Sequence, residues 1–200
     1  MKLELITWKI DIQPEFIIFL SLGLLVIPVP WLLSWILAGV IHELFHFVAL
    51  RLCEYPVKNI KIGFSGARLE TEMEPGFKMA LCAIAGPVSG FLLLAAVHII
   101  PRIAICGLLQ SAWNLLPVYP LDGSRVIIGL LSVVYDAKTV KTICLYLERS
   151  VILLIWIIAC YATFQMHLGI MPILLAFVLF IRKKLLANHQ AWRYNIGNRR

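Results

Sequence analysis

The segment from Ala38 to Ala49, "AGVIHELFHFVA", places two histidines and a glutamate inside an otherwise apolar stretch. His42, Glu43 and His46 lie near the middle of the apolar segment from Trp31 to Leu52. A charged group at the centre of a bilayer costs about 2.5–3.5 kcal/mol on insertion scales, so ionisable residues at that depth mark a functional site by default. These three side chains are therefore the first candidates for chemistry in this chain.

The composition indicates a membrane protein. Of the 200 residues, 61% are hydrophobic and 14% are charged, whereas a soluble domain is about 45–50% apolar and about 25% charged. We predict a single domain over residues 1–200 with a basic cytoplasmic tail at 182–200. The formal net charge is +7, but the basic residues lie at the ends of apolar segments. We therefore interpret the charge as a topology signal, with the lipid bilayer as a partner and no nucleic acid.

The lengths of the apolar segments indicate which of them could span a membrane, since a spanning helix needs roughly 20 residues. A further apolar stretch, Val126 to Tyr135, is too short to span and is expected to pack on the bundle or dip into it. The sequence predicts an all-α polytopic membrane protein with about six transmembrane helices. The six segments are Phe16–Pro28, Trp31–Leu52, Met79–Ile100, Ile103–Leu116, Val151–Phe164 and Ile170–Ile181.

The distribution of basic residues predicts the orientation. With six spans and a cytoplasmic N-terminus, all of the 18 Lys and Arg residues except Arg102 fall on the cytoplasmic side. Basic residues concentrate in the cytoplasmic loops of membrane proteins. We therefore predict a multi-pass protein of a bacterial-type cell membrane with both termini in the cytoplasm.

One segment between the second and third apolar stretches has a different pattern. "KNIKIGFSGARLET", from Lys58 to Thr71, places Ile60, Ile62 and Phe64 at every second position and then supplies glycine and serine for a turn. Alternation flanking such a turn is typical of two paired strands. The sequence predicts a short β-hairpin directly after the helix that carries the histidines.

The spacing of the two histidines suits a metal ion. Residues four apart on a helix share a face and lie about 6 Å apart along its axis, so His42 and His46 can bind one ion. In H-E-x-x-H sites the histidines bind zinc and the glutamate is a general base, a role that falls to Glu43. The alternative is three polar residues that satisfy one another and the backbone for helix packing.

A catalytic zinc site usually has three protein ligands. The best candidate for the third is Asp122 in "NLLPVYPLDGSR", where Pro117 and Pro120 break the preceding helix and Gly123 permits a tight turn. Irregular backbone at membrane depth is tolerated only beside protein or water. From the pattern alone, an ordinary Asp-Gly turn at the membrane surface is an equal alternative. We interpret the remaining histidines as interfacial or solvated: His98, His167 and His189.

These motifs together resemble a known family. His42-Glu43-Leu44-Phe45-His46, followed by Pro120-Leu121-Asp122-Gly123, is similar to the site-2 protease family of intramembrane zinc metalloproteases. "AIAGPVSGFLL", from Ala83 to Leu93, is similar to the family's glycine-rich third-span segment. The order of the segments most resembles the sporulation branch, whose type member processes a membrane-associated pro-sigma factor. No CBS or PDZ domain is expected.

The resemblance implies a function and a site. It implies hydrolysis of peptide bonds in or near transmembrane segments of membrane-embedded proteins, as in regulated intramembrane proteolysis. It also implies one zinc ion per chain, held by His42, His46 and Asp122, with Glu43 as the catalytic base. The rival interpretations are a membrane zinc carrier and a relative that binds membrane segments without cleaving them.

Substrate contacts are predicted at two places. Asn114 could hydrogen-bond the substrate backbone or a developing oxyanion, or it could serve as a helix–helix hydrogen bond. The hairpin residues Ile60, Ile62 and Phe64 could receive an extended substrate strand by edge addition, or the hairpin could have no substrate role. Gly86 and Pro87 favour small-residue packing over a local break that admits water.

Overall fold

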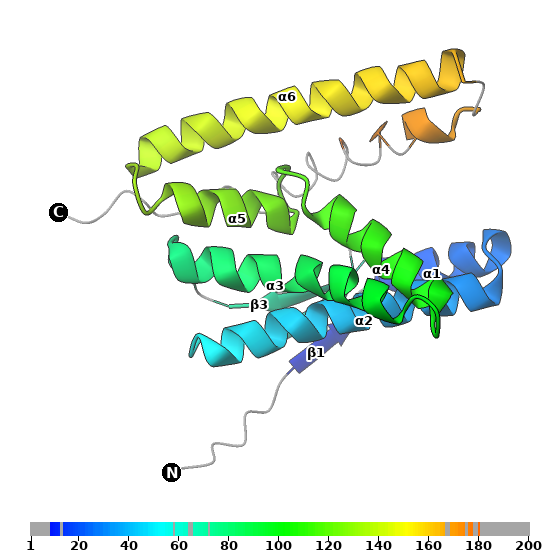
Figure 1. Ribbon diagram of the computed structural model, residues 1–200, viewed down its shortest axis with the longest axis horizontal. Coiled ribbons are helices and arrows are strands. Elements are labelled where there is room, and N and C mark those ends of the chain that lie inside the picture. Colours follow the sequence, from blue (N-terminus) through cyan, green and yellow to red (C-terminus); the bar gives the residue numbers. More distant parts are fainter. Residues whose placement is uncertain are drawn as a thin grey trace, which may run out of the picture.

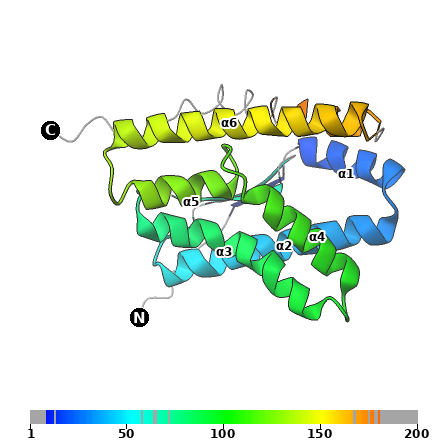
Figure 2. The same ribbon diagram turned by 45° about the horizontal axis from the view of Figure 1, so that its top comes forward.

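The computed structural model describes residues 9–12, 14–57, 59–63, 66–71, 73–166, 169–174, 176–177 and 180. Helix α6 runs along one side of the molecule beside α5, and α2, α3 and α4 lie beyond α5 (Figures 1 and 2). The helices are α1 (Pro14–Val26), α2 (Val29–Leu52), α3 (Phe77–Leu93) with a short 3-10 turn η1 (Leu94–Ala96), α4 (Pro101–Asn114), α5 (Asp122–Leu131) and α6 (Ala137–Phe164).

The prediction of about six transmembrane helices is wrong for the part of the chain that the structure describes. Three helices there are long and apolar enough to cross a membrane: Val29–Leu52, Phe77–Ala96 and Ala137–Phe164. Helices α1 and α4 have 13 and 14 residues. At 1.5 Å per residue each is about 20 Å long, shorter than the roughly 30 Å hydrocarbon core.

The other predicted segments also differ from the structure. The segment predicted as Val151–Phe164 is the second half of α6, which begins at Ala137. The segment predicted as Ile170–Ile181 falls partly outside the described residues. The short stretch from Val126 to Tyr135 overlaps α5, which contacts both α3 and α6. Apolar composition found these segments, but it did not fix their ends.

The prediction of an all-α class with an isolated hairpin is also wrong. The structure has a three-stranded sheet in the order β1-β2-β3, formed by Lys9–Ile12, Asn59–Gly63 and Gly66–Glu70. Strands β2 and β3 are antiparallel, with Ile60 opposite Leu69. Strand β1 pairs in parallel with β2, so a segment that precedes all the helices completes the sheet. A four-residue strand is too short for its alternation to be distinguished in the sequence.

Helix α3 is the centre of the helical packing, since it contacts α2, α4 and α5. Glycines allow two of these close approaches: a Cβ at Gly90 would overlap Ser111 of α4, and a Cβ at Gly129 of α5 would lie 2.7 Å from the backbone nitrogen of Ala80. Small residues let membrane helices pack closely in this way. The site described next lies where α2, α3 and α5 meet.

Candidate metal centre

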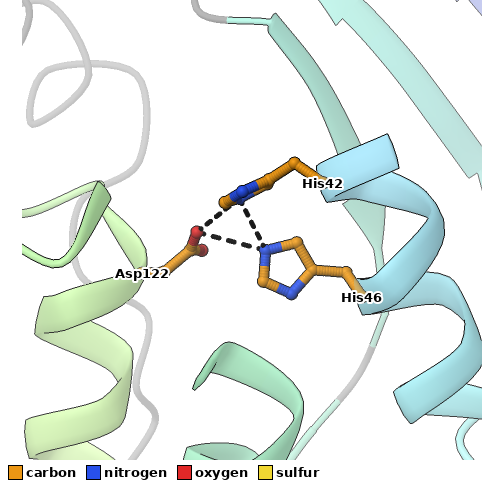
Figure 3. A group of neighbouring side chains, drawn as sticks. All are labelled: His42, His46 and Asp122. Atoms are coloured by element: carbon orange, nitrogen blue, oxygen red, sulfur yellow. Dashed lines mark hydrogen bonds and ion pairs between the residues drawn. The ribbon is translucent and has the colours of Figure 1, made fainter. Parts of the chain in front are cut away.

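Helix α2 places the two histidines one turn apart on one face. The ring centroids of His42 and His46 lie 4.8 Å apart and the ring planes are inclined at 79°. Both rings point from α2 towards Asp122 (Figure 3). The side chains of His42, His46 and Asp122 are 6%, 12% and 13% exposed, so the site is largely enclosed by protein.

Asp122 is the first residue of α5, and the segment before it is held firmly. Val118 and Leu121 are fully buried in a cluster that includes side chains of α6. A Cβ at Gly123 would lie 2.6 Å from the Leu116 carbonyl oxygen and would overlap Leu115. Glycine at 123 therefore lets the first turn of α5 rest directly on this backbone. That contact sets the position of the Asp122 carboxylate.

Three donor atoms converge at the centre of the site. The Asp122 Oδ2 atom lies 3.1 Å from His42 Nε2 and 3.1 Å from His46 Nε2, and the two Nε2 atoms are 3.2 Å apart. In tetrahedral zinc coordination with bonds of 2.0–2.1 Å, neighbouring ligand atoms are separated by about 3.3 Å. The three side chains therefore fit a single ion without rearrangement, and they could hold a metal ion.

The hydrogen bonding of His46 supports a positively charged occupant. His46 Nδ1 lies 2.8 Å from the Cys82 carbonyl oxygen, which can only accept, so Nδ1 carries the proton and donates it. In a neutral imidazole the other nitrogen is then an acceptor. His46 Nε2 and the Asp122 carboxylate thus face each other with lone pairs. Such a contact is favourable when a metal ion or a proton lies between them.

Helix α3 forms the wall behind the imidazoles. A Cβ at Gly86 would lie 2.6 Å from His42 Nε2 and would overlap His46 Nε2. Real Cβ atoms essentially never approach other heavy atoms so closely, and the imidazoles cannot move without leaving Asp122. Gly86 therefore provides the space in which the two rings turn their Nε2 atoms towards the carboxylate.

The comparisons with known proteins concern the fold. The sequence matches no family model and no curated protein. Among solved structures, the chain superposes on the site-2 protease from Methanocaldococcus jannaschii with a TM-score of 0.63 and 20% sequence identity. The match covers 88% of this chain and 89% of that one. The chain shares the fold of a site-2 protease.

The site-2 protease fold brings together three of the predicted site residues. His42, His46 and Asp122 are separated by up to 80 positions in the sequence, yet their donor atoms form one group. Glu43 is partly buried on α2, one residue after His42 and three before His46. On a helix, residues three apart share a face, which places Glu43 beside the His46 side of the site.

The predicted substrate residues belong to α4 and to the sheet. Asn114 is the last residue of α4. Ile60 and Ile62 lie in β2, the central strand, whose backbone pairs with β1 and with β3. Strand β2 therefore has no open edge, and Phe64 lies outside the described residues.

The sequence interpretation missed the contribution of α3. The Cys82 carbonyl, which binds His46, is a main-chain group and leaves no mark in the sequence. The sequence favours ordinary small-residue packing for Gly86 and Pro87, whereas in the structure Gly86 lies against both imidazoles. The available signal was a Gly-Pro pair inside an apolar segment, since proline is costly in the interior of a helix.

Proposed function

We propose that this protein is an intramembrane zinc metalloprotease that hydrolyses peptide bonds in or near transmembrane segments of membrane-associated proteins. The observation that supports this most directly is the convergence of two imidazoles and one carboxylate within an apolar helical protein. Two histidines and a carboxylate form a common ligand set of catalytic zinc. Three protein ligands leave a fourth coordination position open, as catalysis requires.

The ligands in this proposal are His42, His46 and Asp122, with one ion per chain. When bound, zinc supplies Lewis-acid chemistry that polarises a carbonyl group. The Cys82 carbonyl holds the His46 ring so that Nε2 faces the site. The first turn of α5, resting on Leu115 and Leu116, holds the Asp122 carboxylate opposite the two rings.

Glu43 is the proposed general base. It adjoins His42 in the sequence, and the group that could hold a metal ion consists of His42, His46 and Asp122. In this role Glu43 accepts a proton from the attacking water and delivers it to the amine that leaves. Asn114 is proposed to hydrogen-bond the substrate backbone from the end of α4.

The substrate is proposed to bind as an extended strand, because a helical segment hides its peptide bonds within its own hydrogen bonds. Since β2 is paired on both sides, the edge proposed to receive the substrate is the outer edge of β3. Strand β3 also contacts α2, the helix that carries the histidines. Addition of a strand to a sheet edge uses main-chain hydrogen bonds and tolerates varied sequences.

We also propose that the sheet and the start of α6 face the cytoplasm of a bacterial-type cell. Basic residues gather in the connection from α2 to α3 and around the start of α6, whereas the turn between η1 and α4 is followed by Arg102 alone. Strand β1 pairs with β2, which puts the N-terminal segment on the same side. The predicted cytoplasmic C-terminus agrees with the basic residues of 182–200. The finer proposal is regulated proteolysis of the sporulation type.

The test is cleavage of epitope-tagged single-span membrane proteins by the co-expressed wild-type chain and by Glu43→Gln. We expect cleavage by the wild type only, while both proteins retain one zinc ion per chain, because the substitution removes the base and leaves the ligands. Loss of at least 100-fold in cleavage rate is expected for a general base. Equal processing by both proteins would contradict the proposal. Zinc flux through proteoliposomes at equal rates for both proteins would support a carrier instead.

A further inference from the structure

Gln110 is a buried polar side chain at the contact between α4 and α2. Its amide nitrogen donates a hydrogen bond of 2.7 Å to the Trp35 carbonyl oxygen. Its amide oxygen lies 3.6 Å from the position that a Cβ at Gly39 would occupy. The Gly39 N–H is the regular helical donor to the Trp35 carbonyl, which has a second lone pair for Gln110. The Gln110 amide therefore adds a bond between the helices on one turn of α2.

This contact lies one helical turn before the metal centre on α2. Gly39 precedes His42 by three residues, and residues three or four apart are neighbours on a helix face. On the other helix, Gln110 precedes Asn114, the last residue of α4, by one turn. Helix α4 lies against α2 and runs from there towards the start of α5 (Figure 2). The bond thus ties α2 to α4 next to the point where α4 ends.

The end of α4 continues directly into the backbone that supports Asp122. The N–H groups of Leu115 and Leu116 still donate to carbonyls of α4, at 3.0 and 3.2 Å, so both residues follow its last turn. Gly123 rests on the same two residues, because a Cβ there would lie 2.6 Å from the Leu116 carbonyl oxygen and would overlap Leu115. Two contacts in series therefore connect α2 to Asp122, one through Gln110 and one through Gly123. A displacement of α4 along α2 would move the carboxylate relative to the imidazoles.

We propose that Gln110 is a positioning residue of the metal centre. Its bond to the Trp35 carbonyl holds α4 in one register on α2, and the end of α4 in turn holds the Asp122 carboxylate opposite the two imidazoles. This inference rests on the proposed function, because it concerns a metal bound by His42, His46 and Asp122. Gln110 acts through α4 and not as a ligand.

The experiment compares zinc affinity in detergent-solubilised full-length protein, measured by competition with a chromophoric chelator. The variant is Gln110→Met, which keeps the length of the side chain and removes its amide. We expect it to bind zinc about 3- to 20-fold more weakly, the fold-change that corresponds to losing one interhelical hydrogen bond in a membrane protein. The absorption spectrum of the Co²⁺-loaded variant should also change, because Asp122 no longer meets the imidazoles in one fixed geometry.

Gly39→Val disturbs the same contact from α2, since its methyl groups take space beside the Gln110 amide. It should weaken zinc binding in the same way, and it is the second variant should Gln110→Met not fold.

Two control variants separate this role from general effects on the helices. Ser111 is fully buried and adjoins Gln110, but its hydroxyl has no hydrogen-bond partner among the described residues, so Ser111→Ala removes no bond. Gly39→Ala adds a Cβ at an ordinary distance of 3.6 Å from the Gln110 amide oxygen. Both controls should bind zinc within about twofold of the wild type, a margin smaller than the loss expected for Gln110→Met.

Two further measurements separate positioning from general stability. A lower Tm of metal-free Gln110→Met with wild-type zinc affinity and an unchanged Co²⁺ spectrum would show that the bond only stabilises the bundle, and would overturn the inference. In ¹⁵N-labelled wild-type protein, the side-chain amide of Gln110 should exchange its hydrogens with solvent more slowly than that of the exposed Gln165. Equally fast exchange would also overturn the inference. If the wild type itself bound no zinc, the proposed function would fail, which is a separate outcome.

Discussion

Gly86 controls the space around the two imidazoles. Its missing side chain is the reason that His42 and His46 can both point their Nε2 atoms at Asp122 while α3 lies directly behind them. Of the site residues, the sequence predicted the three donors because each carries a side chain in a recognisable motif. It did not predict Gly86 or the Cys82 carbonyl, because a missing side chain and a main-chain oxygen act only through the folded geometry.

Gly86→Ala should therefore remove zinc binding. The new Cβ would lie 2.6 Å from His42 Nε2 and would overlap His46 Nε2, so at least one ring must leave the group. We expect less than one tenth of the wild-type zinc content after purification and no detectable cleavage, because two remaining ligands do not make a catalytic zinc site. The measurement is metal analysis of the purified protein together with the reporter assay.

Gly39→Ala is the matched control, since it also lies in a helix of the bundle. The nearest atom to a Cβ at Gly39 is the Gln110 side-chain oxygen at 3.6 Å, an ordinary contact. This variant should keep its zinc. Full zinc content in Gly86→Ala would show that α3 moves aside at no cost.

The strands show how far pattern analysis extends at the scale of elements. The alternation between Lys58 and Thr71 predicts an isolated hairpin, whereas β2 and β3 belong to a three-stranded sheet. The third strand, β1, lies some 50 positions away and has four residues. For helices, apolarity located α2 and α3 well. It did not show that α1 and α4 are shorter than a bilayer requires, because hydropathy measures composition and not the residue at which a helix ends.

The outer edge of β3 should be needed for cleavage and not for zinc binding. Along an edge strand, backbone groups alternate between facing the partner strand and facing outward. Ala67 and Leu69 share one orientation and Arg68 has the other, so single prolines at these positions sort into two classes. A proline at a position whose N–H faces outward should lower reporter cleavage while zinc content stays unchanged. The reason is that proline removes an N–H that a substrate strand would use. Wild-type cleavage by all three variants would contradict substrate addition at this edge.

At the scale of the whole molecule, the metal centre joins parts of the chain that are far apart in sequence. The histidines belong to α2 and the carboxylate to α5, and α3 lies between them in the chain. The sequence predicted this meeting through the resemblance of its two motifs to a known family. Helical periodicity alone leaves two equal interpretations of Asp122, a third metal ligand and an ordinary Asp-Gly turn. Periodicity does not decide between them, because the pairing of distant elements is set by tertiary packing.

Zinc should accordingly stabilise the whole fold. A ligand that binds only the folded state adds about 4 kcal/mol to the free energy of unfolding at a thousandfold excess over its Kd. Metal-free wild-type protein should show a higher Tm in detergent on adding zinc. The isosteric Asp122→Asn variant should show a much smaller rise, because it loses the anionic ligand. An equal rise in both proteins would mean that zinc stabilises the protein from another place.

The parallel pairing of β1 with β2 has a mechanical consequence. The chain leaves the sheet after β1, passes through α1 and α2, and returns to the same sheet at β2, so these elements form a closed ring. A tether or partner that pulls on the N-terminal segment therefore loads the strand that follows the histidine helix. Tension applied at the N-terminal segment would reach the helix that carries His42 and His46 through a single strand pair.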